Sequence, residues 1–181
     1  MIRNSALRWG SVSITLHWLT ALLIISLAVV GLLMTELPNS PFKLQVYALH
    51  KSFGLTVFAL AALRLVWRWI AGSPDDLPGS RLQALAAKTV HVAFYVLMFA
   101  MPLSGWLYNS ASGFPLRWFG IVSLPKLFTG YNPELKRLAH DLHETGFYVM
   151  AALLLLHAGA ALYHHYIKRD DTLKRMTRSS P

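Results

Sequence analysis

The chain has 181 residues, of which 55% are hydrophobic and 14% are charged, and its mean hydropathy is +0.43. Charged residues make up about a quarter of an ordinary soluble domain, so this composition predicts a membrane protein. The absence of cysteine excludes disulfides, thiolate metal ligands and covalent CxxCH attachment of a cofactor. The net charge of +9 does not indicate nucleic acid as a partner, because most basic residues flank apolar segments.

Four apolar stretches are long enough to cross a bilayer. They run over about residues 14–34, 47–70, 90–108 and 143–167. The first stretch is not a cleavable signal peptide, because its apolar core is too long and no small-residue cleavage site follows it. We therefore expect an all-α integral membrane protein, a single domain over residues 1–181 folded as a four-transmembrane-helix bundle.

The segments between these stretches carry local signals of their own. Ser11 or Ser13 is expected to cap the first helix, and a proline-rich turn follows it. Residues 73–80, SPDDLPGS, form a polar connection, and Pro102 predicts a kink or a freed carbonyl in the third helix. The longest connection, about residues 109–141, mixes aromatic, aliphatic and basic residues. It is expected to be an amphipathic outer loop on the membrane surface.

Basic residues are divided unevenly between the two sides of this bundle. Eleven lie on the side of both termini and six on the other side, which places both termini in the cytoplasm under the positive-inside rule. The eleven are Arg3, Arg8, Arg64, Arg68, Arg81, Lys88, Lys168, Arg169, Lys174, Arg175 and Arg178, and the six are Lys43, Lys51, Arg117, Lys126, Lys136 and Arg137.

Histidines are the most informative residues, because ionisable side chains inside a membrane are costly and indicate function. His143 and His157 lie on nearly the same face of the fourth helix, about 21 Å apart along its axis. With cytoplasmic termini, His17 and His91 share the inner level with His157, whereas His50 shares the outer level with His143. Each level therefore offers a pair of imidazoles from different helices.

Facing imidazoles in a four-helix bundle are typical axial ligands of haem iron, so two levels predict two bis-histidine haems. The spacing leaves open which of His17, His91 and His157 are the inner ligands. One alternative is that the histidines form hydrogen bonds between helices. Another is a histidine-lined metal or proton pathway, which is weaker because zinc needs about four close ligands and the helix interiors contain no acid.

Motifs in all four segments resemble the bacterial cytochrome b561 family, di-haem proteins of the bacterial cytoplasmic (inner) membrane. The resemblance implies two non-covalent b-type haems, one held by His50 and His143 on the outer side and one by His17 and His157 on the inner side. His91 is then expected to line the inner haem pocket or a quinone site. The matching motifs are SITLHWLTALL, LHKSFG, HVAFYVLMFAMPLSGW, LHETGFYV and LHAGAALYHHYIKRDDTLKRM.

The same resemblance implies electron transfer with quinone, and some members oxidise superoxide at the periplasmic face and reduce ubiquinone. Four bases are candidates for attracting superoxide, because a basic funnel raises the local concentration of a small anion. Alternatively, these bases contact lipid phosphates or pair with nearby acids. The four are Lys51, Lys126, Lys136 and Arg137.

For the quinone end, candidate hydrogen-bond and proton donors are His91, His164, His165 and the basic tail, and His91 is the first choice. Arg64 and Arg68 are expected to face lipid headgroups, or else to pair with the inner haem propionates. Related b-type subunits of membrane dehydrogenases and hydrogenases share the histidine pattern. A second expectation is therefore a haem b membrane anchor that passes electrons between quinone and a partner redox subunit.

Overall fold

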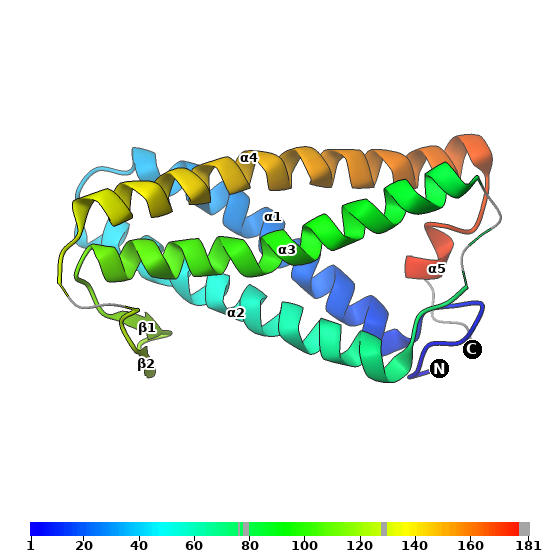
Figure 1. Ribbon diagram of the computed structural model, residues 1–181, viewed down its shortest axis with the longest axis horizontal. Helices are drawn as coiled ribbons and strands as arrows, with labels where there is room; N and C mark the ends of the chain where they lie inside the picture. Colours follow the sequence, from blue (N-terminus) through cyan, green and yellow to red (C-terminus); the bar gives the residue numbers. More distant parts are fainter. Residues whose placement is uncertain (76, 78–79, 128–129, 178–181) are drawn as a thin grey trace.

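The computed structural model describes all residues except 76, 78–79, 128–129 and 178–181. Its main elements are four long helices that run alongside one another as a bundle (Figure 1). All four are long and apolar enough to cross a membrane, which confirms the predicted all-α fold. They are α1 (Ser11–Glu36), α2 (Pro41–Ala71), α3 (Arg81–Ala111) and α4 (Pro133–Tyr163).

The two ends of the bundle differ (Figure 1). The N-terminal segment, the end of α2, the start of α3 and the last described residues of the chain lie at one end, called here the termini end. At this end α4 continues as the π-helix η1 (His164–Lys168), followed by the short helix α5 (Lys174–Thr177). The opposite end, the hairpin end, carries strands β1 (Leu116–Trp118) and β2 (Val122–Leu124), which pair antiparallel.

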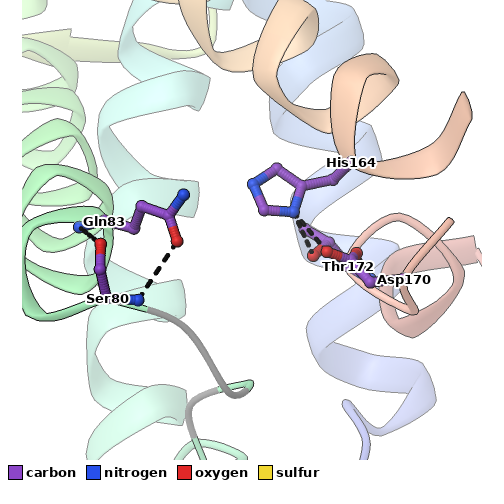
Figure 2. A network of polar contacts seen from close by, with 5 residues as sticks. All are labelled: Ser80, Gln83, His164, Asp170 and Thr172. Carbon is purple, nitrogen blue, oxygen red and sulfur yellow. Dashed lines mark hydrogen bonds and ion pairs between the residues drawn. The ribbon is translucent and has the colours of Figure 1, made fainter. Parts of the chain in front are cut away.

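Capping explains where the later helices begin. The side chains of Ser40, Ser80 and Asn132 accept backbone N–H groups at the starts of α2, α3 and α4. Ser80 and Gln83 form a reciprocal capping box (Figure 2). Because Asn132 and the following proline start α4 at once, the helix begins about ten residues before the predicted position near His143.

The predicted serine cap of α1 is wrong. Gly10 occupies the cap position, and no side chain caps this helix. The hydroxyl of Ser13 is used elsewhere, because it donates to Asn4 Oδ1 at 2.7 Å and accepts from Trp67 Nε1 at 3.0 Å. Asn4 also donates to the carbonyl of Gly72 at 2.7 Å. These contacts connect the N-terminal segment to the start of α1 and to the end of α2.

The outer connection folds as a hairpin that packs on α2. Ser52 accepts the backbone N–H of Phe119 at 2.9 Å, and Trp118 Nε1 donates to Thr56 at 3.2 Å. Phe119 and Gly120 both have positive φ, which the tight turn between the strands requires. The placement of this segment on a membrane surface stays a prediction.

Helices that are consecutive in the chain pack against each other, and α3 with α4 is the closest pair. The described buried core consists of Val57, Ala61, Met98 and Met150. Gly146 permits the α3–α4 contact, since a Cβ there would overlap the side chain of Met101. Helices α1 and α2 approach α4 less closely, so the contact of α4 with these two helices depends on longer side chains.

Candidate functional site

At the hairpin end, His50 of α2 and His143 of α4 face each other. Their ring centres are 6.3 Å apart, and the ring planes are inclined by 69°. A single metal ion bound by both rings, with metal–nitrogen bonds of about 2 Å, would separate the ring centres by about 6 Å. The pair is therefore spaced to share one iron atom.

His143 is held in the state that a metal ligand needs. Its Nδ1 lies 3.1 Å from the carbonyl oxygen of Met101 and 3.0 Å from Ser104 Oγ. A carbonyl oxygen only accepts hydrogen bonds, so Nδ1 carries the proton and Nε2 presents its lone pair. Backbone carbonyls fix ligating histidines in this way in metal sites generally.

Two glycines leave room for these imidazoles. A Cβ at Gly31 of α1 would lie 3.2 Å from Cε1 of His50, and a Cβ at Gly105 of α3 would lie 3.5 Å from Cε1 of His143. His50 Nδ1 is buried and has no hydrogen-bond partner among the described residues. The hairpin-end site is thus built by all four helices, and its donor set and its space fit a bis-histidine haem.

At the termini end, His17 of α1 and His157 of α4 are paired at the same separation. Their ring centres are 6.2 Å apart, with the planes inclined by 63°. Arg64 of α2 approaches His17, with Nη2 3.1 Å from Nδ1. Because a guanidinium only donates, this contact makes Nδ1 the acceptor and places the proton on Nε2. Coordination through Nε2 therefore requires Arg64 to release this contact. Its guanidinium would then be free to pair with a propionate of the haem.

His91 joins the termini-end pair as a third imidazole. Its ring centre lies 5.7 Å from that of His157, closer than the ring of His17. The residue is exposed, however, whereas His17, His50, His143 and His157 are all half-buried. Phe94, one turn further along α3, packs its ring edge on His157 at 5.4 Å.

The two arginines of α2 do not behave alike. Arg64 is half-buried and lies over the ring of Tyr95 as well as against His17, so the expectation that it faces lipid headgroups is wrong. Arg64 lies about two turns before the end of α2 at Ala71, on the side of the helix where His17 of α1 and Tyr95 of α3 contact it. Arg68 is exposed and lies over the ring of Trp9.

The four candidate superoxide-attracting bases occupy different surroundings at the hairpin end. Lys51 donates to Asn109 Oδ1 at 3.1 Å, and Lys126 donates to the carbonyl of Gly113 at 2.7 Å. Lys136 lies over the ring of Tyr108, 5.5 Å from its centre. In the part of the chain that the structure describes, no salt bridge joins these bases to a carboxylate.

Two of these bases form a pocket. An open pocket of about 210 Å³ at the start of α4 is lined by Tyr108, Pro133, Lys136, Arg137 and His140. His140 also faces Asp141 at 3.7 Å and Glu144 at 3.9 Å. Lys51 and Lys126 lie outside this pocket, so the predicted basic funnel is brought together only in part.

Sequence reasoning missed the residues that hold the imidazoles. Neither Ser104 nor the carbonyl of Met101 carries a sequence signal for contact with His143. The spacing of seven residues from His157 to His164 was available as a signal, because it places both on one face of a helix. Its significance depends on Asp170, which the fold brings back to His164, at 2.5 Å from its Nδ1.

Comparison with known proteins agrees with this geometry. A family model described as prokaryotic cytochrome b561 matches residues 8–179. The chain is 34% identical to cytochrome b561 homolog 2 of Escherichia coli K12, covering 96% of this chain and 93% of that protein. It is 33% identical to cytochrome b561 homolog 1 of the same organism, covering 93% and 96%. It is 25% identical to a Yersinia pestis protein described as probable superoxide oxidase CybB, covering 93% and 95%.

Proposed function

Because this chain belongs to the prokaryotic cytochrome b561 family, and is therefore a multi-pass membrane electron carrier that binds haem b, we propose that it oxidises superoxide and reduces ubiquinone. The observation that carries the proposal is the pairing of histidines at both ends of α4, each pair spaced for one iron atom. The name of the Yersinia pestis relative supports superoxide as the electron donor.

His50 and His143 hold the haem of the hairpin end, and His17 and His157 hold the haem of the termini end. Both pairs are half-buried and lie on different helices, as ligands of a macrocycle in a bundle must. His91 lines the termini-end site, and we assign His17 rather than His91 as the ligand because His17 is half-buried whereas His91 is exposed. When bound, the haems supply one-electron transfer. The residues of the chain position them, and Arg64 provides a charge beside His17.

Superoxide is oxidised at the hairpin end, which the distribution of basic residues assigns to the periplasm of a bacterial inner membrane. Lys136 and Arg137 line an open pocket there, and Lys51 follows the ligand His50 directly. Positive charge on the walls of a pocket raises the local concentration and the association rate of a small anion. Lys126 adds a further positive charge to the same end.

Ubiquinone is reduced at the termini end, which lies on the cytoplasmic side. The tail and the α2–α3 connection close this end, since Trp18 Nε1 donates to the carbonyl of Met176 at 2.7 Å and Arg175 donates to the carbonyl of Asp75 at 2.7 Å. Several imidazoles are grouped near this end, namely His91, His164 and His165. They supply hydrogen-bond donors for the two quinone oxygens.

Stopped-flow absorption of the purified, oxidised protein tests the proposal. We expect a pulse of superoxide to reduce the b-type haem quickly, and ubiquinone then to reoxidise it. Haem that stays oxidised in superoxide but is reduced by ubiquinol would contradict the proposal and favour an anchor that serves a partner redox subunit. A colourless preparation, obtained with adequate haem supply, would refute both and favour a histidine-lined metal or proton pathway.

A further inference from the structure

One face of α4 carries a further histidine, His164, in addition to the two haem-pair histidines His143 and His157. His143, Met150, His157 and His164 follow one another at intervals of seven residues. Seven residues make nearly two full turns, so all four side chains lie on one stripe that drifts by only about 20° per interval. His164 therefore lies about 10 Å beyond His157 along the axis, toward the termini end and on the same side of the helix.

The chain folds back on itself directly after this residue. Helix α4 ends at Tyr163, the π-helix η1 follows, and Arg169 adopts a left-handed conformation with φ 56°. The carbonyl of His164 accepts the N–H groups of both Arg169 and Asp170. π-Helical turns and left-handed residues other than glycine are uncommon and concentrate at functional sites.

This reversal places a carboxylate on the His164 imidazole (Figure 2). Asp170 Oδ2 lies 2.5 Å from His164 Nδ1, and Thr172 Oγ1 lies 3.4 Å from the same nitrogen. Thr172 in turn donates its backbone N–H to Asp170 Oδ1 at 2.9 Å. The other ring nitrogen of His164 points away from Asp170 and Thr172, toward the side where Ser80 and Gln83 begin α3.

The carboxylate defines the role of each ring nitrogen. Burial raises the pKa of Asp170, but hydrogen bonds from Thr172 and His164 outweigh it and hold this pKa at about 2, so the group stays ionised at neutral pH. An ionised carboxylate only accepts, so His164 Nδ1 is the donor and its orientation is fixed. The carboxylate also balances the positive charge of the imidazole whenever Nε2 carries a proton.

We propose that His164, positioned by Asp170 and Thr172, is the residue that donates protons to the quinone; this inference rests on the proposed function. Reduction of one ubiquinone to ubiquinol consumes two electrons, which two superoxide anions supply as they leave as two O2 molecules. It also consumes two protons. Each proton breaks its bond to His164 Nε2 and forms an O–H bond on a quinone oxygen.

The surroundings of His164 allow it to be recharged from water. The side chains of His164 and Asp170 are 28% and 31% exposed, so Nε2 regains each proton from the solvent on the termini side. The other imidazoles of this end are less suited. His91 packs its ring on His157. His165 has a buried Nδ1 without a hydrogen-bond partner among the described residues, so nothing there fixes its tautomer.

The variant His164→Gln tests this role in the haem-loaded protein. Glutamine keeps a hydrogen-bond donor near the position of Nε2 but cannot release a proton at neutral pH. We expect superoxide to reduce the haem at the wild-type rate, while reoxidation by ubiquinone slows by at least about 100-fold. The equilibrium affinity of the oxidised protein for a short-chain ubiquinone, measured by tryptophan fluorescence, should stay within about twofold of wild type.

Asp170→Asn tests the positioning carboxylate, with Asp171→Asn as the matched control. Both remove one negative charge, but Asp171 is exposed and pairs with Lys174 at 3.0 Å. We expect Asp170→Asn to slow reoxidation by about tenfold and to raise its solvent isotope effect, because proton transfer then limits the rate. Asp171→Asn should behave as wild type.

Three results would overturn the inference. The first is reoxidation of His164→Gln at the wild-type rate. The second is equal slowing by Asp170→Asn and Asp171→Asn, and the third is a defect that lies entirely in ubiquinone affinity. Wild-type haem that ubiquinone does not reoxidise at all would instead refute the proposed function, before any variant is compared. If His164→Gln fails to retain haem, the Asp170 and Asp171 pair decides the matter alone.

Discussion

Replacing the five membrane histidines one at a time by alanine separates the two proposed haem sites. His50 and His143 have ring centres 6.3 Å apart, so loss of either should release the same haem. His17 and His157, at 6.2 Å, should behave likewise at the termini end. Each of these four single variants is expected to lower the haem content from two per chain to about one, because a bis-histidine site loses half of its axial ligands.

The separation of the two sites sets the expected pattern of double variants. His143 and His157 are fourteen residues apart, which is about 21 Å along α4. Substitutions more than about 10 Å apart without shared partners act independently. A His50→Ala, His143→Ala double variant should therefore retain one haem, as either single variant does, whereas His50→Ala combined with His157→Ala should retain none.

Haem content by the pyridine haemochrome assay, together with the reduced absorption spectrum, measures these outcomes. His91→Ala is the internal control, because it removes a neighbouring imidazole of the termini end, and this variant should retain both haems. Retention of both haems in His17→Ala, with loss of one in His91→Ala, would refute the assignment of His17. Loss of spectrally different haems in His50→Ala and His143→Ala would refute the pairing itself.

Three further outcomes are expected. Gly31→Ala should shift the spectrum or potential of the hairpin-end haem, since its Cβ would lie 3.2 Å from His50, whereas Gly105→Ala, with 3.5 Å to His143, should leave both unchanged. Lys136→Gln combined with Arg137→Gln should slow haem reduction by superoxide severalfold and flatten its dependence on ionic strength; an unchanged rate and salt profile would exclude the pocket. Because the folded-state pKa of Asp170 is lowered to about 2 from 3.8, its stabilising contribution is present above pH 4 and is lost as pH falls toward 2. Thermal unfolding of Asp170→Asn should lack this acid-dependent component, and parallel melting curves over that range would contradict the assignment.

The sequence predicted those features that depend on composition and periodicity. Four apolar stretches define four spanning helices, and the spacing of His143 and His157 correctly places both on one face of α4. The helix boundaries were less accurate. The polar first turns of α4 lack apolar periodicity, so only the cap at Asn132 reveals where that helix begins.

Features that depend on tertiary contacts could not be predicted. Ser13 is a good capping residue by type, but contacts with Asn4 and Trp67 override that preference. The sequence neighbours of Arg64 predict a base at the membrane interface. In the structure, however, its position on α2 brings its guanidinium into contact with His17. From the sequence, Asp170 is expected to be an exposed residue of the C-terminal tail. The π-helix η1 and the left-handed Arg169 bring its carboxylate back to His164.

Helix length explains why electron and proton chemistry separate along α4. The hydrocarbon core of a bilayer is about 30 Å thick, and the stripe from His143 to His164 covers about 31 Å of helix. The two ends of this stripe therefore cannot both lie deep in the apolar layer. The haem-pair histidines His143 and His157 span about two thirds of it. His164 comes next, beside the charged residues Lys168 and Arg169, where a partly exposed imidazole meets water. His164 lies one step further along the same face than the haem-pair histidines and has a carboxylate on its ring, so an acceptor reduced at the termini end is best protonated there.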